Sequence, residues 1–472
     1  MSFQDERTWC RAQFAGARFS DIRRGRRVLT VATAMAENPG KSIPQLFKRA
    51  YDVKAAYNLF NHPESIPESL QAGHRELVRR QMCEPGVVLL LEDTSEISWF
   101  TDEPIEGLGP VGNGHELAQG FLLHSVVGVR WPQVPLNTAS RPPLDVLGIA
   151  SQEYYIRKPI PKGEAGNNSK VRKHRSRESQ LWERASESLG AAPKDVRWVR
   201  VCDRGADIYE FLRGCQDLGH GFVVRAAQDR ALVDPKGRLF ETARSAPCLG
   251  HIELELRSRP SHPARTANLS VSAHRVTLQS PERPGHSQGG LPPFSCTVIR
   301  VWEAHPPEGV RALEWILLTD ALVETFEDAV TCATQYASRW AIEEFHKALK
   351  TALGAERLQL ETAHRLFAAI SIMSVVALRL IDLKERVRLK PDAPADTSGL
   401  EPLELKVLSL HLDRKLVTIA DVALAIGRLG GHMNRRRDGM PGILTLWKGL
   451  TELQALVAGA RLGLQLRELG ND

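Results

Sequence analysis

Two aspartates follow apolar runs that are typical of β-strands, and carboxylates placed in this way can share a metal ion. Asp93 comes shortly after the run 86–91, and Asp203 comes directly after the run 196–202. Ligands of α/β sheets gather at the carboxyl ends of strands, where the loops leave room for them. Either aspartate could instead cap a turn or a helix. Glu92 also stays open beside Asp93, because the pattern does not show which face of the first strand is buried.

A long helix is predicted from about residue 327 to 350, and one of its faces carries a carboxylate among cations and a phenol. Steps of 3, 4, 4 and 3 residues place five side chains on one helical stripe: Tyr336, Arg339, Glu343, Lys347 and Lys350. Glu344 points away from this stripe. The same residues could form ordinary surface ion pairs, which contribute ~0.2–0.5 kcal/mol each.

The order of the predicted elements favours an α/β protein. Strands are expected at 86–91, 120–130, 146–156, 196–202, 221–226 and 315–319, with helices between the later ones. A three-strand meander followed by βαβ alternation gives a mixed sheet flanked by helices, an order that matches the ribonuclease H-like fold. We predict a helical domain at 1–75, the ribonuclease H-like domain at 76–227 and 313–385, a β-rich insertion at 228–312, and a helical domain at 386–472.

The positive charge is clustered, which suits a polyanionic partner such as nucleic acid. The chain has 62 Lys and Arg against 56 acidic residues, a net charge of +6. Residues 1–60 hold eleven basic and five acidic residues, residues 157–177 hold eight and one, and a third cluster is 435–437. A solvated loop is the alternative for any one of these runs.

Composition excludes several classes of protein. With 42% hydrophobic and 25% charged residues the chain is neither disordered nor fibrous. The longest apolar stretch, 366–378, is too short to span a bilayer, so a buried helix is expected there. The N-terminus lacks the apolar region of a signal peptide. Seven widely spaced cysteines without a CxxC pair favour a reducing cytosol and buried, inert thiols.

The spacing YxxRxxxExxxxxxK at 336–350 resembles the tyrosine–arginine–glutamate–lysine signature of the DDE cut-and-paste transposases of bacterial insertion sequences. The segments LLLEDTSEIS at 89–98 and VCDRGADIYEFL at 201–212 resemble the two catalytic strands of this family. The stretch RWAIEEFHKALKTALGAER looks like the corresponding helix of the transposase of the kanamycin-resistance transposon. The similarity covers roughly residues 10–460 and is weakest at 157–177 and 228–312.

The resemblance implies an enzyme that binds transposon ends, cleaves them by two-metal phosphodiester hydrolysis through a DNA hairpin, and joins the 3′-hydroxyl ends to target DNA. Asp93, Asp203 and Glu343 would be the catalytic residues and would hold two Mg²⁺ ions, for which Mn²⁺ can substitute. Trp315 would stack on a flipped base. The other implied DNA contacts are Tyr336, Arg339, Lys347, Lys350, Arg225, Arg23, Arg24, Arg26, Arg27 and Lys41.

The implied partners are the terminal inverted repeats and target DNA, both double-stranded, together with a second copy of the chain in a homodimeric synaptic complex. No membrane is expected, and the place of action would be the bacterial cytoplasm, in association with the nucleoid. Two other functions stay open. One is a ribonuclease H-like nuclease without strand transfer, and the other is an inactive DNA-binding inhibitor of transposition.

Overall fold

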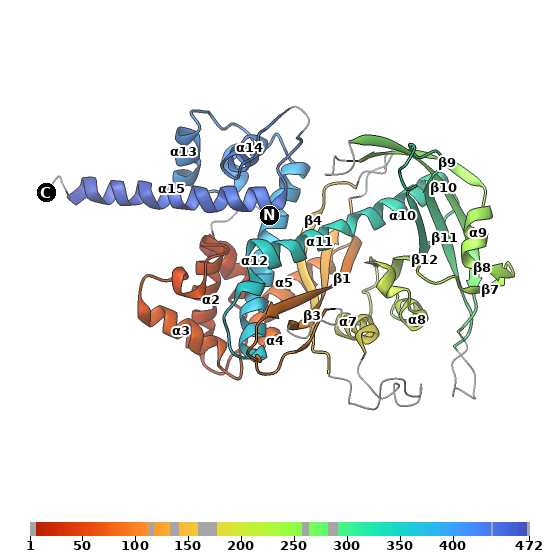
Figure 1. Cartoon of the computed structure of the whole chain (residues 1–472), viewed down its shortest axis with the longest axis horizontal. Helices are drawn as coiled ribbons and strands as arrows, with labels where there is room; N and C mark the ends of the chain where they lie inside the picture. The colour runs from red at the N-terminus through yellow and green to blue at the C-terminus, as the bar shows by residue number, and fades with distance from the viewer. Residues whose placement is uncertain are drawn as a thin grey trace. The chain divides into compact units, whose positions relative to one another are not determined.

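The computed structural model describes residues 6–112, 118–132, 141–158, 177–256, 264–281, 291–435 and 438–469 (Figure 1). The chain divides into two compact units. The first comprises Met1–Gln81, Ser95–Leu122 and Glu343–Asp472, and the second comprises Met82–Thr94 and Leu123–Ile342. Four described elements run from one unit into the other: α5 (Ala72–Met82), which enters the second unit with its last residue, β1 (Gly86–Phe100), β3 (Ala118–Arg130) and α11 (Trp340–Lys347).

The strands of the second unit form a mixed sheet in the order β3-β1-β5-β6-β12-β11-β10-β7-β8, with β4 beside β3 and β9 beside β10. Their bounds are β4 (Asp145–Tyr155), β5 (Val196–Cys202), β6 (Gly221–Arg225), β7 (Ala231–Asp234), β8 (Gly237–Arg238), β9 (Cys248–Leu256), β10 (Arg265–Leu278), β11 (Phe294–Glu303) and β12 (Glu314–Thr319). The short β2 (Gly109–Pro110) pairs with the part of β3 in the first unit.

In the middle of the sheet β1, β5 and β6 lie next to one another and pair in parallel. Most residues of their parallel-paired parts are buried, namely 88–92 of β1, 198–202 of β5 and 221–224 of β6, as expected for parallel strands covered on both faces. From β6 onward the pairing through β12, β11 and β10 is antiparallel. The predicted mixed α/β architecture is therefore confirmed, whereas its identification with the ribonuclease H-like fold stays a prediction.

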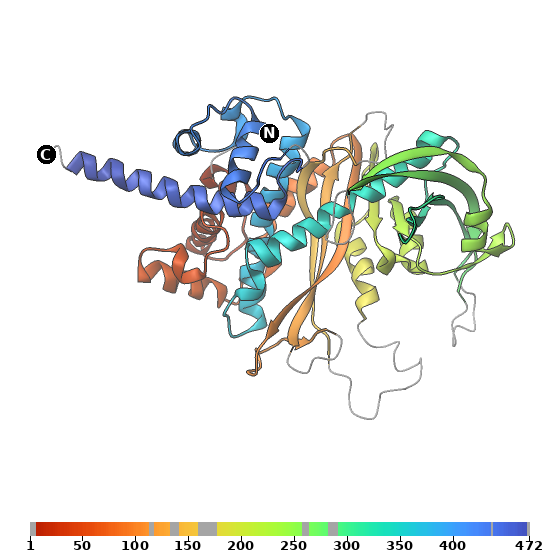
Figure 2. The ribbon, with the colours of Figure 1, turned by 45° about the horizontal axis from the view of Figure 1, so that its top comes forward.

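The segment predicted as a β-rich insertion contains β7 to β11 and helix α9 (Leu239–Ser245). These strands continue the same sheet, because β11 pairs with β12 along its length, from Thr297 opposite Thr319 to Trp302 opposite Glu314. Figure 2 shows the green strands β9 and β10 bending into a curved part of the sheet.

Helices cover the sheet of the second unit. They are η2 (Glu178–Gln180), α7 (Leu181–Leu189), η3 (Arg204–Ala206), α8 (Tyr209–Asp217) and α10 (Phe326–Ser338). Helix α7 contacts β4 and α8, and α10 contacts β5, β6, β10 and β11. Helix α10 begins at a capping box in which Thr325 and Asp328 satisfy each other's backbone N–H groups.

The first unit is mainly helical. Its remaining elements are α1 (Glu6–Phe14), α2 (Ile22–Glu37), η1 (Ile43–Leu46), α3 (Ala50–Phe60), α4 (Pro67–Leu70), α5 (Ala72–Met82), η4 (Ala348–Ala352), η5 (Ala355–Arg357), α12 (Ala363–Leu389), η6 (Ala395–Ser398), α13 (Pro402–His411), α14 (Ile419–Leu429) and α15 (Ile443–Leu469). Helix α12 contacts α2, α3, α4, α14 and α15, so it joins the N-terminal and C-terminal helices.

Helix α12 is the core helix of this unit. It is long and apolar enough to cross a membrane by length and composition, but 78% of its most apolar 18-residue window is buried inside the protein. This burial confirms the prediction of a buried helix for the apolar stretch 366–378. Its neighbours, rather than lipid, surround its hydrophobic side chains.

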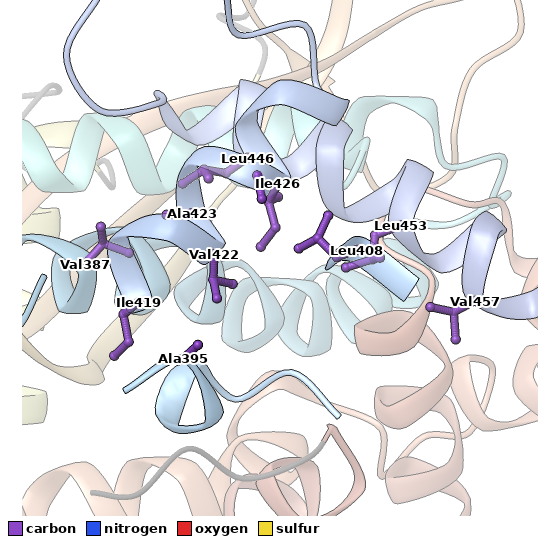
Figure 3. Packing of buried hydrophobic residues seen from close by; sticks show 11 residues of the cluster. Val387, Ala395, Leu408, Ile419, Val422, Ala423, Ile426, Leu446, Leu453 and Val457 are labelled. Atoms are coloured by element: carbon purple, nitrogen blue, oxygen red, sulfur yellow. The ribbon is translucent and has the colours of Figure 1, made fainter. Parts of the chain in front are cut away.

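The C-terminal helices share a hydrophobic cluster (Figure 3). Leu408 of α13, Ile426 of α14 and Leu453 of α15 are each fully buried in it. Full burial of one such side chain stabilises the folded state by roughly 1.5–3 kcal/mol. The end of α15 lies outside this cluster, where Leu462, Leu464 and Leu466 are exposed.

The prediction that the cysteines are buried is confirmed for five of the seven. Cys83 and Cys248 are exposed, so for these two the prediction is wrong, and all seven thiols are free. Burial raises the pKa of the Cys215 thiol to about 12 and that of Cys202 well above its ordinary value. These two thiols therefore stay protonated and unreactive at neutral pH.

Candidate active site

Asp93 and Asp203 lie on neighbouring parallel strands at the point where their pairing stops. The last paired residues are Glu92 of β1 and Cys202 of β5, so the two aspartates come next along each chain. The predicted end of the first strand near residue 91 is wrong, because β1 continues through Asp93 to Phe100. Asp93 thus lies within a strand, at a ledge left by the shorter β5, and Asp203 directly follows the neighbouring position on β5.

The two aspartates are held by backbone N–H groups. Oδ1 of Asp203 accepts from the Gly205 N–H at 2.8 Å and caps the 3-10 turn η3. Its Oδ2 has no hydrogen-bond partner in the described part of the chain. Oδ1 of Asp93 accepts from the Thr94 N–H at 2.9 Å, and 19% of its side chain is exposed. The alternative that Asp203 caps a turn is therefore correct. This cap uses one carboxylate oxygen of Asp203, and the other oxygen can bind a ligand.

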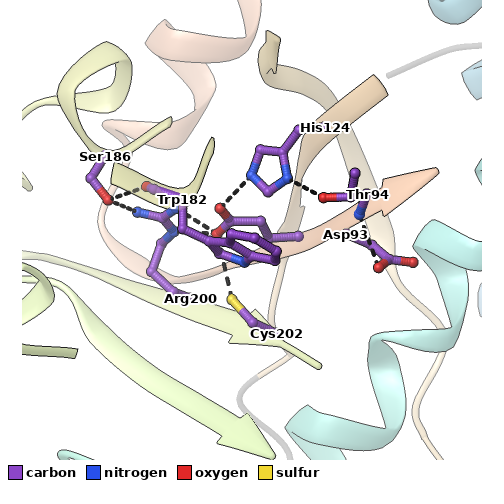
Figure 4. Close-up of polar contacts among 8 residues, drawn as sticks. Asp93, Thr94, His124, Trp182, Ser186, Arg200 and Cys202 are labelled. Carbon is purple, nitrogen blue, oxygen red and sulfur yellow. Dashed lines mark hydrogen bonds and ion pairs between the residues drawn. The ribbon is translucent and has the colours of Figure 1, made fainter. Parts of the chain in front are cut away.

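The structure also separates Asp93 from Glu92. Successive residues of a strand point to opposite faces, and the Glu92 side chain is fully buried. Glu92 is paired with Arg200 of β5 at 2.5 Å and with His124 of β3 at 2.8 Å (Figure 4). Burial alone would raise the pKa of Glu92, but the Arg200 guanidinium and the His124 hydrogen bond outweigh it, so the pKa lies below its usual value. Glu92 is a structural carboxylate, and Asp93 points to the opposite face of β1.

A line of contacts leads from Asp93 to an aromatic side chain. Nη1 of Arg339 lies 3.7 Å from Oδ2 of Asp93. The Arg339 guanidinium lies over the Tyr336 ring, 5.8 Å from its centroid, and the Tyr336 ring meets Trp315 edge-on at 5.5 Å. Tyr336 is only 6% exposed, so it packs between its two neighbours. Trp315 is partly buried near the start of β12.

Arg225 lies beside the same aromatic group. It ends β6, pairs with Leu317 of β12, and is partly buried. Its Nη2 donates to the carbonyl of Glu314 at 3.1 Å, the residue just before Trp315. The structure therefore brings together, in one unit, Asp93, Asp203, Arg339, Tyr336, Trp315 and Arg225.

The predicted continuous helix from 327 to 350 is wrong in two places. Helix α10 ends at Ser338, Arg339 interrupts it with helical dihedral angles, and α11 ends at Lys347. The next five residues form a π-helical turn, η4, which widens the spacing of side chains beyond that of an α-helix. The stripe from Tyr336 to Lys350 is consequently not a single straight face.

Glu343 is partly exposed on α11 and belongs to the first unit, whereas the two aspartates belong to the second. The third carboxylate of the predicted set therefore stays a prediction. Its neighbour Glu344 is paired with Lys384 of α12 at 2.5 Å, with 14% of the Glu344 side chain exposed. This engagement fits the interpretation that Glu344 points away from the stripe.

The two lysines of the stripe differ in their exposure and in their contacts. Lys347 is exposed. Nζ of Lys350 donates to the carbonyl of Glu96 at 2.7 Å and lies 3.1 Å from Oε1 of Glu356. Glu356 also accepts from the Ser98 N–H at 3.1 Å. Lys350 thus holds the second half of β1 within the first unit, and a contact with DNA would require it to exchange these partners.

The chemistry of the two aspartates fits a divalent ion with a preference for oxygen. Carboxylate oxygens are the ligands that Mg²⁺ and Mn²⁺ use, together with water and substrate phosphate. Within the residues that the structure describes, no group of three or more His, Cys, Asp or Glu side chains is gathered closely enough to hold a metal. Asp93 instead faces the Arg339 cation, which offsets its charge.

The basic residues predicted to bind DNA lie on and after helix α2. Arg23 pairs with the N-capping Asp21 at 2.9 Å, and this side-chain hydrogen bond lowers the pKa of Asp21 to about 2. Arg24 lies 3.7 Å from Glu64, and Arg27 lies 3.0 Å from Asp52. These three arginines therefore also have structural partners.

Two other cations of this region are exposed. Arg26 has no ion-pair partner among the described residues. Lys41 donates to Oδ1 of Asn38 at 2.9 Å. The basic loop 157–177, apart from Arg157, Lys158 and Arg177, and the residues Arg436 and Arg437 lie outside the described residues.

The sequence reasoning missed the buried polar group formed by Glu92, His124, Arg200 and their hydrogen-bond partners. An arginine in the middle of the apolar strand VRWVRVC was the available signal, because a fully buried cation needs a buried anion. His124 is fully buried and makes two hydrogen bonds, so it is a satisfied core histidine.

Two family profiles match the ends of the chain. The profile described as Transposase DNA-binding matches residues 6–65, which contain α1, α2, η1 and α3. The profile described as Transposase Tn5 dimerisation domain matches residues 375–470, from the middle of α12 to the end of α15. The exposed leucines at the end of α15 lie within this second match.

Proposed function

We propose that the chain is a Tn5-like transposase that binds DNA, forms a homodimer, and cuts and joins DNA as a DDE enzyme of cut-and-paste type. The observation that carries the proposal is the position of Asp93 and Asp203 on one ledge of the sheet, with Arg339 beside Asp93. A DNA-processing enzyme needs a catalytic centre outside its DNA-binding and dimerisation domains, and this ledge lies between the two matches in the sequence.

Asp93, Asp203 and Glu343 would together hold two Mg²⁺ ions, or Mn²⁺ in their place. When bound, the two ions would activate the attacking oxygen and stabilise the leaving oxygen of an in-line displacement at phosphorus. Asp203 keeps its carboxylate oriented through the Gly205 N–H. Asp93 is oriented by the Thr94 N–H and by the strand on either side of it.

Arg339 would bind a phosphate of the transposon end, because its planar guanidinium can contact two phosphate oxygens at once. In the structure this cation lies against Asp93. A phosphate would draw it away from the carboxylate and leave Asp93 to its metal. Lys347 and Lys350 would add positive charge from the following turns, and Tyr336 would hold the Arg339 stem in place.

Trp315 would stack on a base displaced from the duplex next to the cleavage point, which allows the freed strand to close into a hairpin. Its edge-on contact with Tyr336 supports this role, since it orients the indole ring while Trp315 stays partly exposed, and Arg225 holds the backbone carbonyl of the preceding residue, Glu314. Base–aromatic stacking contributes about 1–3 kcal/mol per base.

The N-terminal helices would recognise the terminal inverted repeats through the basic residues of and after α2, and two protomers would pair two ends. We place this activity on cytoplasmic DNA associated with the nucleoid. The match of a DNA-binding profile at residues 6–65 argues against an inhibitor that lacks end recognition. A nuclease without strand transfer would share the same acids, and only a joining assay separates it from a transposase.

The test uses labelled duplexes taken from the DNA on both sides of the coding sequence, incubated with the full-length protein and Mg²⁺. Asp93→Asn, Asp203→Asn and Glu343→Gln should each lower nicking and joining by at least about 100-fold, because each removes a metal ligand worth several kcal/mol of transition-state stabilisation. DNA binding should persist. The control is Glu187→Gln on α7, an exposed acid of the second unit.

Cleavage that survives any of the three substitutions, or that continues in EDTA, would contradict the proposal. Joined products should appear with target DNA in the wild-type reaction. Nicks without joined products would instead support the nuclease.

A further inference from the structure

The residues on both sides of Asp93 are bound to the same imidazole ring. Nε2 of His124 lies 2.8 Å from Oε1 of Glu92, and Nδ1 of His124 lies 2.7 Å from Oγ1 of Thr94 (Figure 4). His124 is fully buried on β3, and its ring meets Trp182 edge-on at 5.0 Å. One ring therefore bridges the residue before and the residue after Asp93.

This bridge fixes the direction of Asp93. Glu92 and Thr94 point to the same face of β1, since side chains two apart in a strand share a face. Asp93 must then point to the opposite face. Because a carboxylate only accepts, Nε2 carries a proton and donates to Glu92, and the Thr94 hydroxyl donates to Nδ1.

The same cluster holds the strand that carries Asp203. Arg200 of β5 donates to Oε2 of Glu92 through Nε at 2.8 Å and through Nη2 at 2.5 Å. The Cys202 thiol, directly before Asp203, donates to the same oxygen at 3.4 Å. Glu92 thus fixes β5 to β1 one residue before each aspartate.

Arg200 is anchored on its far side. Its Nη1 donates to Oγ of Ser186 on α7 at 2.8 Å, and its guanidinium lies 5.0 Å from the centroid of the Phe211 ring on α8. The cluster consequently joins three strands and two helices beneath the ledge of Asp93 and Asp203, and no member of it faces the ledge side of β1.

We propose that Thr94, His124, Glu92 and Arg200 are positioning residues, which set the direction and spacing of the Asp93 and Asp203 carboxylates for metal binding. The proposal rests on the proposed function of these aspartates. Residues that orient metal ligands typically influence metal affinity or activity by roughly 10- to 100-fold without contacting the metal.

The test is Thr94→Val, compared with Thr94→Ser. Valine keeps the shape and strand preference of threonine but cannot donate to Nδ1 of His124, whereas serine keeps the hydroxyl. Two quantities are measured: Mn²⁺ binding to the full-length protein by electron paramagnetic resonance, and the Mn²⁺ concentration that gives half-maximal nicking.

Thr94→Val should weaken Mn²⁺ binding and raise the half-maximal concentration by about 10-fold, and Thr94→Ser should restore both. The melting temperature and DNA binding should change little in either variant. Wild-type Mn²⁺ binding in Thr94→Val, or equal losses in the valine and serine variants, would overturn the positioning role. Asp93→Asn is run alongside: if it nicks like wild type, the proposed function fails, independently of the result at Thr94.

Discussion

The buried pair of Glu92 and Arg200 gives a sharp prediction for stability. Both side chains are fully buried, and two guanidinium nitrogens of Arg200 bond one oxygen of Glu92. Removing one partner of such a pair leaves an uncompensated charge in the core, which costs about 3–5 kcal/mol. We therefore expect Arg200→Met alone, or Glu92→Gln alone, to destabilise the β1–β5 part of the sheet by that amount.

The double variant should be much closer to wild type. With both charges removed, the amide that replaces the Glu92 carboxylate would still accept from Nε2 of His124, and the thioether side chain at position 200 would fill part of the space of the arginine stem. Replacing a buried ion pair by uncharged groups of similar volume is often nearly neutral. The coupling energy of the cycle should therefore amount to several kcal/mol, far above the coupling of independent sites.

The assay is hydrogen–deuterium exchange of peptides that cover β1 and β5. A loss of about 3–5 kcal/mol corresponds to roughly 140- to 4,000-fold faster exchange. Arg197→Met is the control on the same strand: Arg197 is 48% exposed and pairs with Asp320, so its loss should cost at most about 1 kcal/mol. If Arg200→Met is as mild as Arg197→Met, or if the two single losses simply add, the pair does not hold the strands together.

Three further predictions concern other parts of the chain. Burial lowers the pKa of His74 from 6.5 to about 3. Between these two pH values the imidazole of His74 is protonated in the unfolded state but not in the folded state. Stability should fall as the pH drops from about 6.5 toward 3, by up to ~1.4 kcal/mol per pH unit from this group, and urea unfolding of His74→Gln should lack that slope. Trp315→Ala should leave first-strand nicking near normal and depress hairpin formation, by up to the roughly 1–3 kcal/mol of stacking; equal losses of both products on a gel would make Trp315 a packing residue. Arg26→Ala should reduce the salt slope of DNA binding by about one unit without loss of stability, whereas Arg27→Ala should also lower the melting temperature, because Arg27 is paired with Asp52.

Local patterns were sufficient to predict the strands that carry the two aspartates. The run at 86–91 is wholly apolar and the run at 196–202 is apolar except for Arg197 and Arg200, which is typical of strands covered on both faces, and they form the parallel pair β1 and β5. The apolar stretch 366–378 likewise predicted a buried helix, which α12 confirms. Such predictions succeed because periodicity and hydrophobicity act over a few neighbouring residues.

The end of the first strand could not be predicted, because it depends on a partner far away in the chain. β1 continues to Phe100 after β5 has ended, and this difference in length creates the ledge on which Asp93 lies. The break at Arg339 and the π-helical turn after Lys347 were also missed. The free-energy cost of these two helix irregularities is small and depends on packing. The sequence gives no sign of them, because no residue between 336 and 350 is a helix breaker such as proline or glycine.

The sequence by itself determined which residue types are available for metal and phosphate, and that Asp93 and Asp203 follow strands. Only the tertiary structure decided between Glu92 and Asp93. Adjacent residues of a strand point to opposite faces of the sheet. The side chains of the neighbouring strands determine which of these faces can bury a carboxylate. Here Arg200 of β5 and His124 of β3 lie on the buried face and pair with the Glu92 carboxylate. Asp93 therefore points to the other face of β1, at the ledge.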